Sequence, residues 1–155
     1  MKKAISVCLV LMMLFAFSGS VFAAENVSEV ETTEESSSSV TIYLPGDTNA
    51  RGALATGTLS IANPSVGIAS TTGATYANVW CSLLKLSITL YKYNPDNSSS
   101  TYIDTVNFYG VNGYGVAGEH AFTVPTRHAY YYAFGEHAYK SEEYQYSQTK
   151  AIKIN

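Results

Sequence analysis

The chain has 155 residues, of which 46% are hydrophobic and 13% aromatic, and its formal net charge is −3. This length suits one domain. Five glutamates between Glu25 and Ser39 carry the acidic excess, because acidic and basic residues balance from Val40 onward. A neutral domain without a basic patch does not favour nucleic-acid binding, so nucleic acid is not an expected partner.

The first 23 residues have the pattern of a secretory signal peptide. Met1–Lys3 is basic, Ala4–Phe17 carries no charge, and Val21–Ala23 places small residues where cleavage after Ala23 requires them. The uncharged stretch is shorter than the roughly 20 residues that span a bilayer, although an uncleaved membrane anchor remains the alternative. We expect a secreted, extracellular protein with no membrane contact after cleavage.

Residues 24–39 differ in composition from the rest of the chain. They hold the five glutamates and a run of four serines, and they contain no aromatic residue. Such a segment cannot bury enough apolar surface to offset the entropy of ordering it. We therefore expect a disordered acidic linker there, followed by one folded domain over residues 40–155. A glycosylated or wall-threading stalk is the alternative.

The stretch Leu84–Tyr93 shows the clearest periodicity in the chain. Leu84, Leu86, Ile88 and Leu90 recur at every second position, and the residues between them are polar. A β-strand sends successive side chains to opposite faces, so this spacing predicts a strand with one apolar face. That face needs a second layer to bury it.

Turn signals divide the remaining sequence into short strands. Asn94–Ser100 is dense in turn-forming residues, and Asn112–Gly113 predicts a hairpin turn because both residues tolerate positive φ. The other expected strand positions are Thr58–Ile61, Val66–Ile68, Tyr76–Leu83, Tyr102–Tyr109, His120–Val124, Tyr130–Phe134 and Ile152–Ile154. No segment has a helical period. We predict an all-β protein, an antiparallel β-sandwich of about seven strands.

Two sets of motifs resemble known proteins. Phe122–Val124 followed by Tyr130–Phe134 resembles the late strands of immunoglobulin-like and fibronectin type III sandwiches. Between Tyr43 and Asn155, a Tyr-Leu-Pro-Gly-Asp-Thr-Asn-Ala-Arg-Gly opening, a Thr-Gly-Thr-Leu-Ser-Ile strand, Gly135–His137 and a closing Ile-Lys-Ile-Asn resemble a family of small secreted proteins from Gram-positive bacteria. That family has no assigned activity, so the resemblance implies no catalytic residues.

Few residues could carry chemistry. Cys81 is the one cysteine left after cleavage, and its apolar surroundings favour a buried thiol over a nucleophile or a bridge between chains. His120, His128 and His137 lack the spacing of metal ligands. Gly113–Gly118 matches the dinucleotide-binding glycine pattern, but a strand follows it where a helix is needed. We expect no cofactor, no metal and no catalytic residue.

The 13 tyrosines are the most unusual feature of the composition. Six fall where alternation predicts solvent-facing strand positions or loops: Tyr91, Tyr93, Tyr131, Tyr139, Tyr144 and Tyr146. Aromatic rings give binding surfaces a large contact area at a small entropic cost. Cross-strand pairs that only stabilise the sheet are the alternative. We predict a secreted binding module for a glycan, cell-wall or protein partner, with a secreted hydrolase or a self-assembling structural subunit as the other hypotheses.

Overall fold

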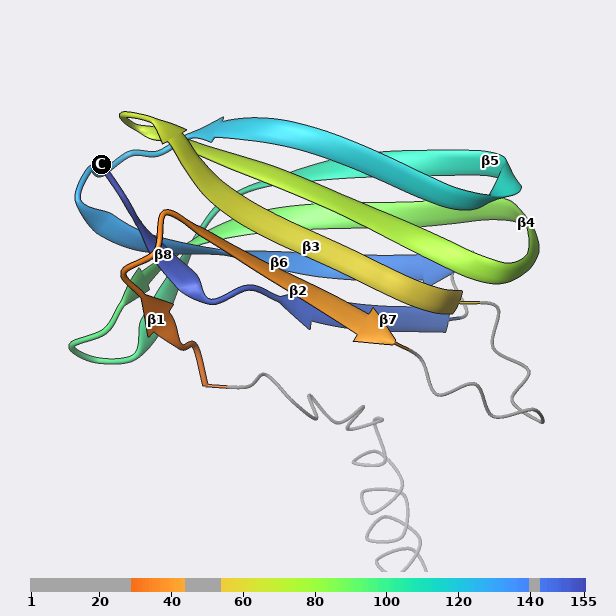
Figure 1. Ribbon diagram of the computed structural model, residues 1–155, viewed down its shortest axis with the longest axis horizontal. Coiled ribbons are helices and arrows are strands. Elements are labelled where there is room, and N and C mark those ends of the chain that lie inside the picture. Colours follow the sequence, from red (N-terminus) through yellow and green to blue (C-terminus); the bar gives the residue numbers. More distant parts are fainter. Residues whose placement is uncertain (1–28, 44–53, 140–142) are drawn as a thin grey trace, which may run out of the picture.

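The computed structural model describes residues 29–43, 54–139 and 143–155, and within these ranges it contains strands and no helix (Figure 1). The strands are β1 (Thr32–Thr33), β2 (Ser37–Tyr43), β3 (Leu54–Ser65), β4 (Ile68–Asn94), β5 (Ser99–Thr123), β6 (Ala129–Tyr139), β7 (Glu143–Gln148) and β8 (Ala151–Ile154). The predicted all-β class is confirmed. The expected signal peptide, residues 1–23, lies outside the described residues.

The strands form one sheet instead of two. Its order is β1-β8-β6-β4-β3-β2, with β5 alongside β4 and β7 alongside β6. The β1–β8 pair is parallel and the other described pairs are antiparallel, so the sheet is mixed. Strands β2 and β7 approach each other without pairing, which leaves a nearly closed, barrel-like sheet. The expected immunoglobulin- or fibronectin-type sandwich is not confirmed.

Two long strands fold this sheet onto itself. β4 has 27 residues and pairs with β3 up to Ala77 and with β6 from Leu84 onward. β5 follows β4 through both parts, and the register shift between Tyr76 and Cys81 marks the bend (Figure 1). We call the two parts the β3 half (β2, β3, the start of β4, the end of β5) and the β6 half (the start of β5, the end of β4, β6, β7, β8).

The core lies between the two halves. The row predicted on Leu84–Leu90 is confirmed, because Leu84, Leu86, Ile88 and Leu90 are all buried. They pack with Leu59 and Ile61 of β3 in one hydrophobic cluster. Each such side chain contributes about 1.5–3 kcal/mol when it leaves water. Cys81 belongs to the same cluster, as expected of a buried thiol.

The hairpin turn predicted at Asn112–Gly113 is wrong. β5 runs through these residues, and the turn between β4 and β5 lies at Pro95–Ser98, inside the predicted Asn94–Ser100 loop. Asn112 does adopt a positive φ of 55°. The chain uses that conformation where β5 bends from one half to the other. The positive φ expected of Asn112 is therefore present, but it serves a bend within a strand and not a hairpin turn.

The segment expected to be a disordered linker is partly ordered. Residues 32–33 form β1, and β2 begins at Ser37, three residues before the expected domain boundary at Val40. The register of β2 on β3 runs from Ser37 against Ala62 to Tyr43 against Thr56. Ladder hydrogen bonds need no apolar side chains, which is why composition alone underestimated the order of this segment. Residues 24–28 lie outside the described residues.

His137 links the two halves through the core. Its ring is 1% exposed, with Nδ1 2.8 Å from Oγ1 of Thr75 and Nε2 2.8 Å from Oγ of Ser147. Gly57 makes room for it, since a Cβ there would lie 2.7 Å from Nε2. Burial lowers the pKa of His137 from 6.5 to about 4, so the ring is neutral in the folded protein at pH 7.

We expect His137 to make the protein less stable in acid. Its pKa is lower in the folded than in the unfolded chain, so the unfolded chain binds the extra proton as the pH falls from 6.5 to about 4. The free energy of unfolding should stay level above pH 7 and drop by up to about 3 kcal/mol across that window. Denaturant titrations at several pH values measure this drop. His137→Gln should reduce it, and an unchanged drop in that variant would contradict the assignment.

Candidate functional site: a tyrosine-bearing sheet face

The outer face of the β6 half carries eight of the 13 tyrosines, and we call it the tyrosine face. Its aromatic residues are Tyr102 and Tyr109 on β5, Tyr91 and Tyr93 on β4, Tyr130, Tyr132 and Phe134 on β6, and Tyr144 and Tyr146 on β7. Directly paired residues share a face, and Leu90–Ala133 points inward, so the neighbouring pair Tyr91–Tyr132 points outward. The outer face of the β3 half instead presents mainly small side chains such as Thr58, Ser60 and Thr72, with Tyr43 and Tyr76 exposed at one end of it.

One end of the tyrosine face is a packed aromatic cluster. Tyr91 stacks on Tyr132 with ring centroids 5.3 Å apart and planes 13° apart, and Tyr102 meets Tyr91 edge-on at 6.1 Å. Tyr93 meets Tyr132 edge-on at 6.5 Å, and Val30 packs against the same cluster. Such pairs contribute about 0.5–1.5 kcal/mol each beyond the area they bury. Tyr93 and Tyr132 are buried by these contacts while Tyr102 is 56% exposed, so most of this end stabilises the sheet.

The other end places polar groups between exposed rings. One row across the strands is Tyr109, Lys85, Ala138 and Tyr144, and the next is Asn107, Ser87, Glu136 and Tyr146. Lys85 Nζ donates to Glu136 Oε1 at 3.1 Å, and Ser87 Oγ donates to Asn107 Oδ1 at 2.7 Å. Tyr109, Tyr144 and Tyr146 are all exposed. A polar lane thus runs between the rings of β5 and those of β7.

The six tyrosines predicted to bind have three different positions. Tyr144 and Tyr146 are exposed on the tyrosine face, while Tyr91 and Tyr93 lie in its packed cluster. Tyr139 packs against the core between the halves.

The solvent-facing position predicted for Tyr131 is wrong. Tyr131 is 0% exposed, and its hydroxyl donates to the carbonyl oxygen of Thr126 at 2.8 Å. Desolvation raises the pKa of this hydroxyl. Alternation failed here because aromatic residues occupy both the odd and the even positions of Tyr130–Phe134, so the sequence does not show which set faces the core. Only the pairing of Leu90 with Ala133 decides which parity faces the core.

Sequence reasoning missed Tyr109, Tyr102 and the Lys85–Glu136 pair. Tyr109 directly follows the inward-facing Phe108, so alternation along the strand could have placed it on the outer face. Tyr102 could not be placed in this way, because the register shift between Leu90 and Tyr91 changes the parity of the β4–β5 pairing. Lys85 was placed correctly on the polar face of the central strand, but Glu136 reaches it only through the β4–β6 register.

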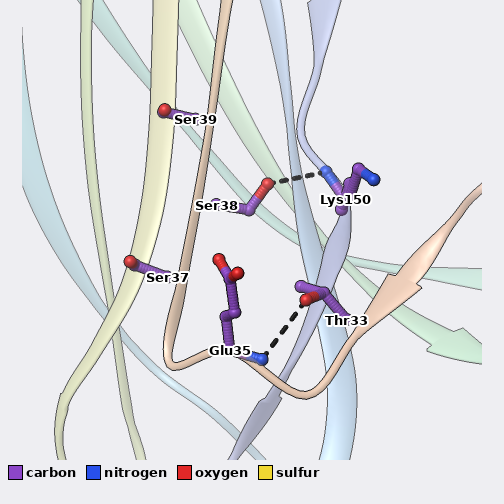
Figure 2. A pocket seen from close by; sticks show the side chains of 6 residues that line it. All are labelled: Thr33, Glu35, Ser37, Ser38, Ser39 and Lys150. Atoms are coloured by element: carbon purple, nitrogen blue, oxygen red, sulfur yellow. Dashed lines mark hydrogen bonds between the residues drawn. The ribbon is translucent and has the colours of Figure 1, made fainter.

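A polar pocket of about 310 Å³ lies beside β2 and is the second candidate (Figure 2). It is lined by Thr33, Glu35, Ser37, Ser38, Ser39 and Lys150. The Lys150 backbone N–H donates to Ser38 Oγ at 3.0 Å, and that of Glu35 donates to Thr33 Oγ1 at 3.2 Å. Glu31 raises the pKa of Lys150 through their ion pair of 2.6 Å. These contacts fasten the N-terminal segment to β8, and no aromatic ring lines the pocket.

The histidines of the described residues do not form a metal or hydrolytic site. In that part of the chain no group of three or more His, Cys, Asp and Glu side chains is placed to hold a metal ion. His128 sits in a turn with φ of 57°, and His120 packs edge-on against Phe122. The His137–Ser147 contact resembles a base and nucleophile, but both side chains are buried, so no substrate reaches them.

Comparison with known proteins adds little to this geometry. A scan against models of protein families and a search of curated proteins both returned no match. Among solved structures, the sporulation control protein Spo0M from Bacillus subtilis matches at 12% identity and a TM-score of 0.31. The match covers 78% of this chain and 51% of that one, so the chain spans about half the length of Spo0M. A likeness this weak carries no argument. No helix of the described residues is long and apolar enough to cross a membrane.

The two ends of the tyrosine face should respond differently to truncation. Tyr132→Ala removes a nearly buried ring that touches Tyr91 and Tyr93, so we expect the free energy of unfolding to fall by about 2–4 kcal/mol. Tyr144→Ala removes an exposed ring and should cost less than about 1 kcal/mol. Urea denaturation measures both changes. Equal losses would contradict the division of the face into a packed end and an open end.

Proposed function

We propose that the protein is a secreted binding module whose tyrosine face holds a glycan. The observation that carries this proposal is the open end of the face, where the exposed rings of Tyr109, Tyr144 and Tyr146 flank the Lys85–Glu136 pair. Secretion is supported by the leader pattern of residues 1–23.

A saccharide fits this arrangement chemically. A pyranose ring has an apolar C–H face, which suits an aromatic ring, and a rim of hydroxyls that need hydrogen-bond partners. Tyr109 and Tyr144 supply rings on opposite sides of the lane, Lys85 and Glu136 supply a donor and acceptors between the strands that carry them, and Asn107 lies near Tyr109 on β5. Rigid aromatic side chains lose little entropy on binding. A linear glycan lying across the strands would meet each of these groups in turn.

We also propose that the folded sheet serves the face as a sandwich scaffold of the immunoglobulin or fibronectin type III kind. The supporting observations are the hydrophobic cluster between the halves and the hydrogen bonds by which His137 joins Thr75 of β4 to Ser147 of β7. A rigid scaffold holds the flanking rings at a set separation, which favours one ligand conformation over others.

We expect Tyr109→Ala and Tyr144→Ala each to weaken glycan binding by at least about fivefold, which corresponds to about 1 kcal/mol of binding free energy. Tyr43→Ala is the matched control, since Tyr43 is 77% exposed, against 60% for Tyr109, and lies on β2 in the other half. A glycan array and pull-down on insoluble peptidoglycan, with the melting temperature recorded for each variant, make the measurement.

Two outcomes would contradict the proposal. Binding that tolerates both substitutions on the tyrosine face would place the ligand elsewhere. An equal loss in Tyr43→Ala would show that exposed tyrosines act non-specifically. Glu136→Gln gives a separate check on the polar lane, since it removes the charge paired with Lys85 and leaves the rings in place.

A further inference from the structure

Among the described residues, the bend of the β4–β5 hairpin exposes a group of five large apolar side chains. We call residues 78–83 and 111–114 the apex. Its exposed large side chains are Val79, Trp80, Leu83, Val111 and Tyr114. They come from both strands of the hairpin at one end of the folded sheet, away from the C-terminus (Figure 1). Trp80 is the one tryptophan of the chain and is 56% exposed.

The apex carries no formal charge. The sequence has no Asp, Glu, Lys or Arg from Ala77 to Leu84 or from Thr105 to Gly118. Lys85, the next charged residue along the chain, is paired with Glu136 at 3.1 Å. The hairpin ladder continues into the apex through the pairs Cys81–Gly113 and Leu83–Val111. Few charges would therefore leave water with this surface, which lowers the cost of moving it.

We propose that the apex inserts into the interfacial region of a lipid bilayer, so that the protein lies on a membrane surface. Tryptophan and tyrosine combine an apolar ring with a polar N–H or O–H and prefer the depth of the lipid headgroups. Val79, Leu83 and Val111 supply aliphatic groups that reach the acyl boundary below. Since the apex is uncharged, binding depends on apolar area and does not require anionic lipid.

A membrane surface fits the apex better than a protein or a glycan does. A stable protein interface uses roughly 20–30 residues on each side, whereas the apex is a short bend. A glycan needs polar side chains between the rings, as on the tyrosine face. The expectation of no membrane contact after cleavage rested on the length of apolar segments, which concerns spanning a bilayer and not lying on it.

Trp80 makes the proposal directly testable in the full chain. Because residues 4–17 are themselves apolar, sedimentation with vesicles would not identify the apex, whereas Trp80 fluorescence reports only its own surroundings. With phosphatidylcholine vesicles we expect a blue shift of the emission and quenching by lipids brominated near the headgroup end of the chains. Added phosphatidylserine or high salt should leave the titration unchanged.

A pair of valine variants supplies the control. Val111→Asp should weaken vesicle partitioning at least roughly tenfold, because it puts a charge into the inserted surface while Trp80 remains as reporter. Val66→Asp is matched in exposure, 62% against 67% for Val111, but lies in the turn between β3 and β4 and should have no effect. Far-ultraviolet circular dichroism should show both variants folded.

Three results would overturn the proposal. One is Trp80 emission that vesicles leave unchanged. A second is an equal effect of the two valine variants. The third is a blue shift that needs no lipid and grows with protein concentration, which would make a second copy of the chain the partner of the apex.

Discussion

One strand that serves both halves of the sheet is the constraint on which this structure depends. β4 has 27 residues, which would extend to about 90 Å if straight and would expose its apolar row to water. The bend between Tyr76 and Cys81 turns the strand back on itself. Its first half then faces its second, and a Cβ on Gly73 would lie 3.1 Å from Leu86 and 3.2 Å from Ile88. The β4–β5 hairpin thus supplies half of the buried residues in the core cluster.

That constraint also separates three surfaces with different chemistry. The side chains of the inner faces form the core and make the His137 hydrogen bonds. The outer face of the β3 half carries mainly small polar side chains, with Tyr43 and Tyr76 at one end, and that of the β6 half is aromatic. The bend itself cannot alternate regularly, so Asn78, Val79 and Trp80 are all exposed. Both proposed binding surfaces therefore lie where the core does not need the side chains.

The sequence pattern predicted the features that depend only on residues near one another in the chain. The period-two row of Leu84–Leu90, the all-β class and the turn within Asn94–Ser100 need only side-chain alternation and turn preferences. The outward position of Lys85 and the buried Cys81 follow from the same reasoning.

Features set by pairing between distant strands could not be predicted. Nothing local indicates that Asn112 lies in a bend and not in a hairpin turn. The run containing Tyr131 has aromatic residues at both odd and even positions, so only its register on β4 shows which of them face the core. The joining of Lys85 to Glu136 between exposed rings likewise depends on three strand pairings at once.

The most direct test of the proposed glycan-binding face is to observe its rings while ligand is added. A nuclear magnetic resonance titration with soluble peptidoglycan fragments and neutral oligosaccharides reports each tyrosine separately. We expect shifts of the ring protons of Tyr109, Tyr144 and Tyr146 and of the amides along β7, with the β3 half unchanged. Shifts confined to the β3 half or to the pocket beside β2, with those three rings unmoved, would contradict it.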